Sequence, residues 1–190
     1  MIDILIFFVC ALLYILIVAL IVISLVFTYL TVASGFMKSS PSVPSCGKVK
    51  KAMLDDVAAI LKAKTEPLTV IDLGSGWGTL LLPLAQQFPQ HRFIGYEIAR
   101  LPFHISKIRS HKLNNINFLR EDILQADISD ADIVFLFLLP SMMQKLTDKC
   151  KKEMKPDALI YSNRFRLPEV QEQQKISLGS DFESYYIYKM

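Results

Sequence analysis

The chain has 190 residues, which suits one compact domain with an additional segment better than two full domains. Hydrophobic residues make up 52% of the sequence and the mean hydropathy is +0.36, an excess that is concentrated at the N-terminal end. The formal net charge of +3 is too small to indicate a nucleic-acid partner, and we expect none.

The N-terminal segment is uncharged over a long stretch. No charged residue occurs from Ile4 to Met37, and the apolar run from Ile4 to Leu30 exceeds the ~20 residues that a helix needs to cross a bilayer. A cleaved signal peptide does not fit, because Asp3 makes the start acidic and the apolar run is too long. We therefore expect residues 1–37 to form a retained transmembrane anchor. The alternative is a core helix of a larger assembly.

The residues after this segment predict its orientation. Lys38, Lys48, Lys50 and Lys51 follow it and no basic residue precedes it, so the positive-inside rule places the rest of the chain in the cytoplasm of a single-pass membrane protein. Residues 38–47 are rich in serine and proline and read as a non-helical linker. The remaining residues, 48–190, form the predicted domain.

The domain alternates helical and strand patterns. Apolar residues at three-to-four spacing predict a helix over residues 48–63. Short apolar runs then predict strands at 68–73, 92–96, 116–119, 131–139 and 158–162, with helices at 79–88, 101–111 and 142–154. Two last strands, 175–178 and 184–189, read as a hairpin. We expect an α/β fold with seven strands, mostly parallel, and an antiparallel C-terminal edge hairpin.

A glycine-rich loop follows the first predicted strand. Gly74, Gly76 and Gly78 alternate there, so the backbone can bend tightly and a ligand can approach closer than a Cβ atom would permit. A dinucleotide-binding dehydrogenase would show G-x-G-x-x-G instead. The cofactor-binding residues predicted in this loop are Asp72, Gly74, Ser75, Gly76, Trp77 and Gly78.

A carboxylate closes the second predicted strand. Glu97 lies about 20 residues beyond the loop, where a carboxylate can accept hydrogen bonds from both hydroxyl groups of a ribose. The alternative is a solvated glutamate at the end of a strand. Because ligands of open α/β sheets bind at the carboxyl ends of the strands, the loop and Glu97 predict a single nucleotide-type site.

The loop resembles the first motif of class I S-adenosylmethionine-dependent methyltransferases, in which two apolar residues, Asp and a further apolar residue precede Gly-x-Gly-x-Gly. Asp72, two residues before Gly74, matches that pattern. The resemblance implies a Rossmann-like methyltransferase sheet with S-adenosyl-L-methionine as cofactor. It also implies that Asp122, after the third strand, contacts the adenine amino group, with a helix N-cap as the alternative role.

The chain further resembles a narrower family, the small membrane-anchored lysine methyltransferases that include the ATP synthase c-subunit and adenine nucleotide translocase enzymes and their prokaryotic relatives. The resemblance covers Pro41 to Arg166. It rests on Pro41-Ser42-Val43-Pro44, on the helix with Val49, Met53 and Leu54, on the glycine loop, on Gly95-Tyr96-Glu97 and on residues 133–146. It implies a protein-lysine N-methyltransferase, with Pro140 and Ser141 on the substrate side of the site. It assigns no general base.

The chain departs from this family at two positions. Trp77 stands where the family commonly has an acidic residue, and Ile98-Ala99-Arg100 replaces the family's Asn-Pro after the glutamate. Two alternatives to lysine methylation therefore remain. One is methylation of a lipid, quinone or other small molecule, and the other is a domain that binds the cofactor without catalysis.

Other polar residues give no further site. The three cysteines and three histidines lack the spacing of metal ligands, so we expect no metal site. Lys107, Arg109 and Lys112 form a basic cluster that we interpret as a solvated helix face rather than a partner site.

Overall fold

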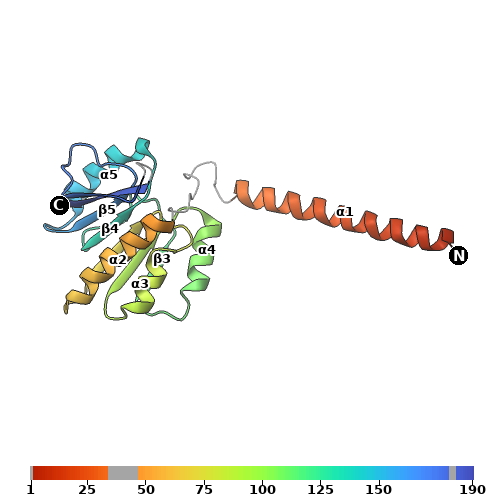
Figure 1. Cartoon of the computed structure of the whole chain (residues 1–190), viewed down its shortest axis with the longest axis horizontal. Coiled ribbons are helices and arrows are strands. Elements are labelled where there is room, and N and C mark those ends of the chain that lie inside the picture. The colour runs from red at the N-terminus through yellow and green to blue at the C-terminus, as the bar shows by residue number, and fades with distance from the viewer. Residues whose placement is uncertain (1, 34–46, 180–182) are drawn as a thin grey trace.

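The structure is a computed structural model that describes residues 2–33, 47–179 and 183–190. Its first element, α1 (Ile2–Ala33), contains a stretch from Ile6 to Tyr29 that is long and apolar enough to cross a membrane. Every side chain from 6 to 29 is exposed except the partly exposed Ala11, and Figure 1 shows α1 apart from the other elements. The predicted linker lies outside the described residues except for Gly47, which begins the next helix.

The rest of the described chain is built on one sheet. Its strands are β1 (Thr69–Leu73), β2 (Arg92–Tyr96), β3 (Ile116–Leu119), β4 (Ile133–Leu136), β5 (Leu159–Asn163), β6 (Gln174–Ser177) and β7 (Ser184–Lys189), in the spatial order β3-β2-β1-β4-β5-β7-β6. β1 to β5 are parallel, and β7 pairs antiparallel with both β5 and β6. The predicted seven-stranded sheet with an antiparallel C-terminal hairpin is confirmed.

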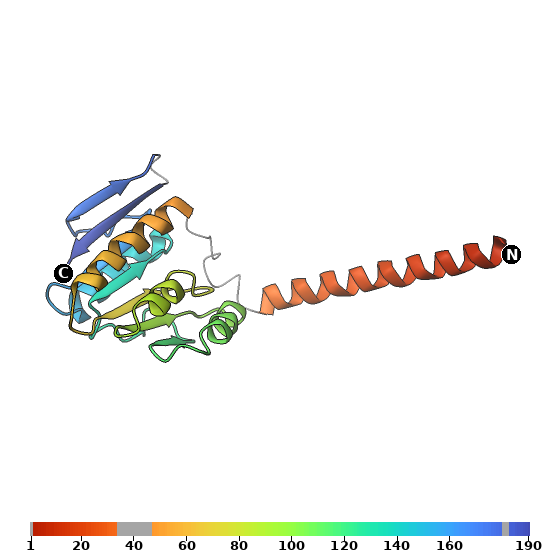
Figure 2. The same cartoon turned by 60° about the horizontal axis from the view of Figure 1, so that its bottom comes forward.

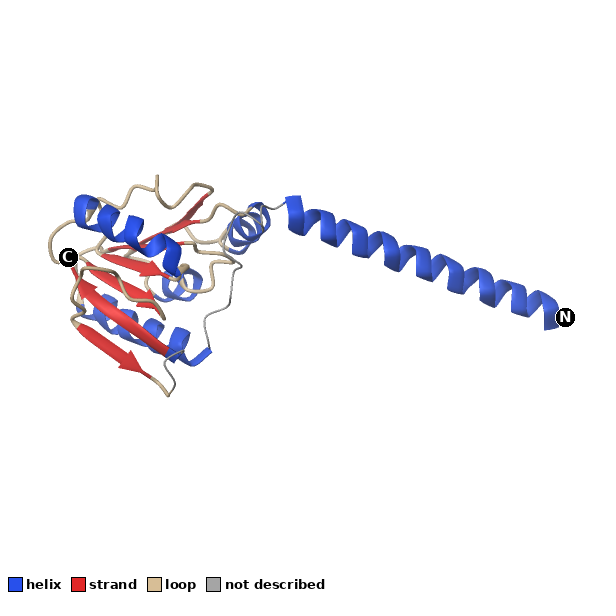
Figure 3. Cartoon of the chain, turned by 90° about the horizontal axis from the view of Figure 1, so that it is seen from above, coloured by secondary structure: helices blue, strands red, loops and turns tan. Residues whose placement is uncertain are grey.

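Helices cover both faces of this sheet, as Figure 3 shows. They are α2 (Gly47–Ala63), α3 (Leu81–Gln87), α4 (Arg100–Arg109) and α5 (Pro140–Glu153). α2 and α3 pack on the face that carries Phe93, Phe135 and Tyr161, whereas α5 packs on the face that carries Ile94 and Val134. The strands are therefore buried on both sides, which explains their nearly continuous apolar sequences.

The helix α2 begins near the carboxyl ends of strands β1 to β5. Its last turn lies near the amino ends of these strands, where the Leu61 carbonyl accepts from His91 Nε2 at 2.9 Å and His91 Nδ1 accepts from the Leu68 N–H. Its first turn carries Lys48, whose Nζ lies 3.8 Å from a carboxylate oxygen of Glu183, the residue before β7. Figure 2 shows α2 running along the sheet between these two ends of the strands.

Two predicted boundaries around β4 were wrong. The strand expected at 131–139 is limited to Ile133–Leu136, and the helix expected from 142 begins at Pro140. Proline is well suited to the first turn of a helix, because its fixed φ is helical and its missing N–H would be unpaired there. Residues 137–139 therefore connect the strand to the helix and form no part of the sheet.

Candidate functional site

The glycine loop folds back over the end of β2. Gly74, Gly76 and Gly78 have φ angles of +90°, +52° and +73°, a left-handed region that favours glycine. The N–H groups of Gly74 and Ser75 both donate to the Tyr96 carbonyl at 2.9 Å. The alternating glycines predicted from the sequence thus form a tight turn tied to the neighbouring strand.

The Phe118 ring on β3 packs against the glycine loop and against Gly95 of β2. A Cβ atom on Gly95 would lie 2.5 Å from Phe118 Cδ1 and 2.7 Å from Ser75 Oγ, and one on Gly78 would lie 2.6 Å from Phe118 Cζ. Side chains at either glycine would therefore displace the buried Phe118 ring. Neither Gly95 nor Phe118 was predicted to be a site residue, although a glycine inside an apolar strand is a signal of close packing.

Glu97 links the glycine loop to the start of α4. Its Oε2 accepts the N–H of Gly76 at 2.8 Å and its Oε1 accepts the N–H of Ala99 at 2.7 Å. The side chain is buried, so it is not the solvated strand-end residue of the alternative interpretation. A carboxylate can accept about four hydrogen bonds, and Glu97 retains capacity for a ligand's hydroxyl groups.

Asp72 is a second buried carboxyl group beside Glu97. It is 4% exposed and has no hydrogen-bond partner among the residues that the structure describes. Burial, with a smaller contribution from the charge of Glu97, raises the pKa of Asp72 to about 7. A cationic ligand at this edge would offset the repulsion between the two carboxylates.

The Ser75 side chain lies against Gly95 of β2. Its Oγ is buried, has no partner among the described residues and would lie 2.7 Å from a Cβ atom on Gly95. The backbone of Ser75, through its bond to Tyr96, holds the turn. Contact of Ser75 with a cofactor remains a prediction.

Asp122 caps a turn rather than the helix N-terminus that the sequence left as an alternative, because the described residues 120–132 contain no helix. Its Oδ1 accepts the N–H of Leu124 at 2.9 Å, and its carbonyl accepts the N–H groups of Gln125 and Ala126. Its second carboxylate oxygen carries no bond to the described residues. A contact between Asp122 and adenine remains a prediction.

Trp77 lies at the surface of the loop, with 38% of its area exposed. Its carbonyl accepts a hydrogen bond from Arg109 Nη1 at 2.7 Å, which ties the last turn of α4 to the loop. Arg109 is itself exposed, as expected for the predicted solvated basic face. Its bond to Trp77 was not predicted, because it joins positions 32 residues apart.

The substrate-side candidates lie at the start of α5. Pro140 and Ser141 are exposed, and the preceding Leu138 lies against the loop, with its Cδ2 at 3.3 Å from a Cβ atom placed on Gly74. The end of β4 is therefore adjacent to the glycine loop. Met143 is buried in the core with Met142 packed against it, which agrees with ordinary packing at the helix start.

These residues fit S-adenosyl-L-methionine. The buried, unpaired Asp72 provides negative charge for a cationic group, and Glu97 provides acceptor capacity at the end of β2, where a ribose binds in folds of this kind. Within the described ranges, no three His, Cys, Asp or Glu side chains lie together as a metal site would require.

A solved structure shares this fold. An RNA methyltransferase from Salinibacter ruber, in complex with S-adenosyl-L-homocysteine, superposes with a TM-score of 0.67 and is 26% identical in sequence. The match covers 77% of the present chain and 93% of that protein. The likeness supports the assignment of a methyltransferase fold.

Two characterised relatives are similar in sequence. A protein-lysine N-methyltransferase from Saccharolobus islandicus is 28% identical over 159 residues, which cover 81% of this chain and 96% of the relative. The adenine nucleotide translocase lysine N-methyltransferase of Mus musculus is 30% identical over 133 residues, 67% of this chain, and the match spans 56% of the mouse protein.

The family to which the chain belongs is shown by a match that covers more than half of the chain. Residues 72–174 match the family described as the ANTKMT methyltransferase domain. This range contains the glycine loop, Glu97, Asp122 and the start of α5. The resemblance found in the sequence is confirmed: the chain belongs to the ANTKMT methyltransferase domain family and is an S-adenosyl-L-methionine-dependent methyltransferase.

Proposed function

We propose that this protein is a membrane-anchored protein-lysine N-methyltransferase whose catalytic domain lies on the cytoplasmic side. The observation that carries the proposal is the buried Asp72 and Glu97 pair beside the glycine loop, in a chain that matches a lysine methyltransferase over 96% of the relative's length. The match to the mouse translocase enzyme supports the same acceptor class.

The residues of the chain would act mainly by binding and alignment. When bound, S-adenosyl-L-methionine supplies a methyl group on a positively charged sulfur. Glu97 would hold the ribose, Asp72 would face positive charge, and Pro140 and Ser141 would border the acceptor lysine. Orientation and exclusion of water can supply several kcal/mol of the rate enhancement. The lysine amine must lose its proton to react, since its ordinary pKa is ~10.4. We assign no general base.

The helix α1 supports the anchoring part of the proposal. Its 24-residue stretch from Ile6 to Tyr29 matches the thickness of a bilayer. The side chains of this stretch are exposed in the structure, so they require an apolar environment that the described chain does not provide. The basic residues after the helix favour the cytoplasmic side for the domain.

Methyl transfer to membrane components tests the proposal. The purified full-length protein would be incubated with radiolabelled S-adenosyl-L-methionine and with membranes from a strain that lacks the gene. Protein, lipid and RNA fractions would then be counted separately. We expect label in a protein band, with lysine as the modified residue by mass spectrometry. Glu97→Ala should abolish the signal, and Glu66→Gln, at an exposed site outside the loop, should retain it.

The same experiment has outcomes that contradict the proposal. Label found only in the lipid extract would indicate a small-molecule acceptor, and label only in RNA would indicate a nucleic-acid acceptor. Cofactor binding without transfer to any fraction would indicate a non-catalytic domain.

A further inference from the structure

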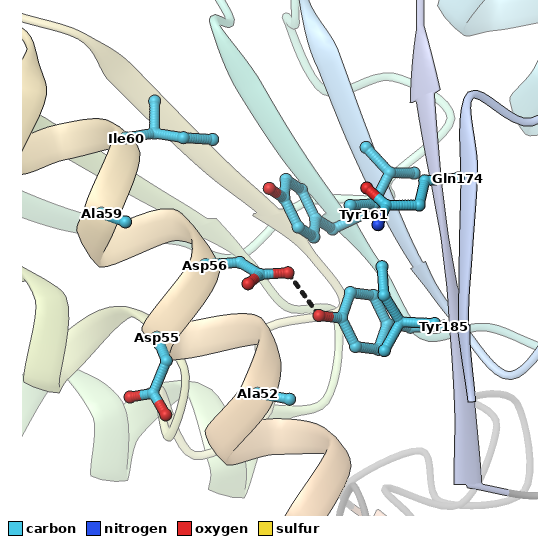
Figure 4. A pocket seen from close by; sticks show the side chains of 10 residues that line it. Ala52, Asp55, Asp56, Ala59, Ile60, Tyr161, Gln174 and Tyr185 are labelled. Atoms are coloured by element: carbon cyan, nitrogen blue, oxygen red, sulfur yellow. Dashed lines mark hydrogen bonds between the residues drawn. The ribbon is translucent and has the colours of Figure 1, made fainter. Parts of the chain in front are cut away.

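A groove lies between α2 and the C-terminal edge of the sheet. It has a volume of about 540 Å³, and α2 forms one wall while β5, β6 and β7 form the other. Figure 4 shows its lining side chains. The lining includes Asp55 and Asp56 from α2, Tyr161 from β5, Gln174 and Ile176 from β6, and Tyr185 from β7. None of them belongs to the predicted cofactor or substrate-side residues.

The polar groups of the groove are acidic, phenolic or neutral. Asp56 extends from α2 toward Tyr185, whose hydroxyl donates to Asp56 Oδ2 (Figure 4). Asp55 is exposed at the outer rim. No Lys, Arg or His is among the lining residues, so nothing in the groove wall neutralises these two carboxylates. The local charge favours a cation.

Tyr161 provides an independent sign of a ligand. It is 2% exposed, yet its hydroxyl group has no hydrogen-bond partner among the described residues, and Figure 4 shows this hydroxyl directed toward α2. Burial, together with the nearby Asp56, raises the pKa of Tyr161 to about 12, so the phenol keeps its proton at neutral pH. The hydroxyl is not one of the fully buried atoms without a partner, so it reaches the groove and can donate to or accept from a group bound there.

Burial leaves the hydroxyl groups of Tyr161 and Tyr185, rather than their ring faces, to contact a ligand. The rings are stacked, with their centroids 6.2 Å apart and an interplanar angle of 24°, and the two residues are 2% and 1% exposed. Carboxylates form charge-assisted hydrogen bonds with ammonium and guanidinium groups, and a hydroxyl oxygen can accept from the same groups. A groove with both features suits the side chain of lysine or arginine.

The position of the groove at the edge of the sheet favours a polypeptide. Among the described residues, β6 is the outermost strand of the sheet and pairs with β7 alone, so its other side is open to a further strand. An extended peptide can add to such an edge while its side chains enter adjacent pockets. Gln174 and Ile176, two residues apart on β6, face the groove together, as alternation along a strand requires.

We propose that this groove binds a basic side chain of a polypeptide that docks along β6. The Asp56 carboxylate and the Tyr161 hydroxyl oxygen hold the cationic group, and Asp55 attracts it at the rim. This binding needs no bound cofactor and no methyl transfer, so it stands or fails separately from the proposed function.

Titration of the full-length protein in detergent micelles tests this proposal. The probes are N-acetyl-arginine amide, N-acetyl-lysine amide and the neutral N-acetyl-glutamine amide, and the readout is NMR of ¹³C-labelled tyrosine rings. The Tyr185 signal is assigned from Tyr185→Phe. We expect the two basic probes to shift the Tyr161 and Tyr185 signals and the neutral probe to leave them unchanged. A preference between the basic probes identifies the favoured head group.

Matched variants distinguish the effect of the charge in the groove from an effect of the overall charge of the protein. Asp56→Asn keeps an acceptor for the Tyr185 hydroxyl and should weaken basic-probe binding about fivefold. Gln174→Lys, on an exposed edge strand, should weaken it similarly by placing a cation in the groove. Asp148→Asn, an exposed substitution on α5 across the sheet, should have no effect. Unchanged binding of S-adenosyl-L-homocysteine would show that each variant is folded.

Two results would overturn the proposal. One is the absence of tyrosine shifts with both basic probes. The other is an equal loss of binding in Asp56→Asn and Asp148→Asn, which would show that the probe responds to overall charge rather than to the groove.

Discussion

The carboxylate of Glu97 accepts the backbone N–H of Gly76 at 2.8 Å, so one side chain at the end of β2 fixes the turn at the end of β1. Its other oxygen holds the N–H of Ala99 at the entry to α4. The loop conformation and the start of α4 therefore depend on the same charged group.

Replacing this carboxylate by an amide should weaken cofactor binding. In Glu97→Gln one oxygen becomes an NH₂ group that cannot accept from Gly76 or Ala99, and a hydrogen bond to a charged group contributes ~1.5–3 kcal/mol. We expect the affinity for S-adenosyl-L-homocysteine, measured by calorimetry, to fall by about tenfold to a hundredfold. Glu66→Gln is the control, and equal affinities for both variants would contradict the role of Glu97.

Asp72 should lower the stability of the cofactor-free protein at neutral and alkaline pH. Its folded-state pKa of about 7 exceeds the ordinary aspartate value, so the folded state binds more protons than the unfolded state between these values, and stability falls as pH rises through this window. Asp72→Asn should therefore raise the free energy of unfolding at pH 8 by up to ~4 kcal/mol and have little effect at pH 4.

Thermal unfolding of the full-length protein in detergent at both pH values measures this difference. Asp130→Asn, at an exposed loop position, should leave the pH dependence unchanged. The same Asp72→Asn variant should bind S-adenosyl-L-methionine more weakly at pH 8, since the charge that favours a cationic ligand is gone. Equal pH dependence in the Asp72 and Asp130 variants would refute the buried-charge explanation.

Gly95 should tolerate no side chain. In Gly95→Ala the new Cβ atom would lie 2.5 Å from the buried Phe118 ring, and overpacking of this kind costs about 1–3 kcal/mol. Denaturant unfolding should show this loss together with weaker cofactor binding. Gly47→Ala is the matched control, because nothing lies within 4 Å of its added atom. Adding Phe118→Leu to Gly95→Ala should recover part of the stability, and failure to recover it would argue against the clash.

Charges in the middle of α1 should release the protein from membranes. Leu16 and Leu20 lie near the centre of the apolar stretch, where each arginine costs ~2.5–3.5 kcal/mol for insertion. The Leu16→Arg, Leu20→Arg double variant should move from the membrane pellet to the supernatant in carbonate extraction, whereas a Leu16→Met, Leu20→Met control should stay in the pellet. Retention of the arginine variant would contradict a spanning helix.

Much of the fold could be predicted from the sequence because its signals are local. The strands β2 and β3 have the predicted bounds, since each is a short apolar run between polar or turn residues. The boundary errors around β4 arose where apolar residues continue past the end of strand pairing. Pro140 was interpreted as the end of the strand, but it is also the first residue of the helix.

The candidate site was only partly predictable. The glycines, Glu97 and Asp122 carry a recognisable spacing, but the contacts that shape the site join distant positions. Phe118 beneath Gly95 and Arg109 at the Trp77 carbonyl depend on how strands and helices pack. The acidic groove depends in the same way on the proximity of Asp56 to Tyr185, which are separated by 129 positions in the chain.

The helix α2 starts near the carboxyl ends of the parallel strands, and this position limits how far from the membrane the enzyme can reach an acceptor. In an anchored chain, residues 34–46 are all that join α1 to the start of α2, and even fully extended they reach roughly 45 Å. Encounters with an acceptor would then be confined to a thin layer above the bilayer. Within that layer the rate would follow the acceptor's surface density rather than its bulk concentration, so an acceptor in the same membrane would have a kinetic advantage over a soluble one.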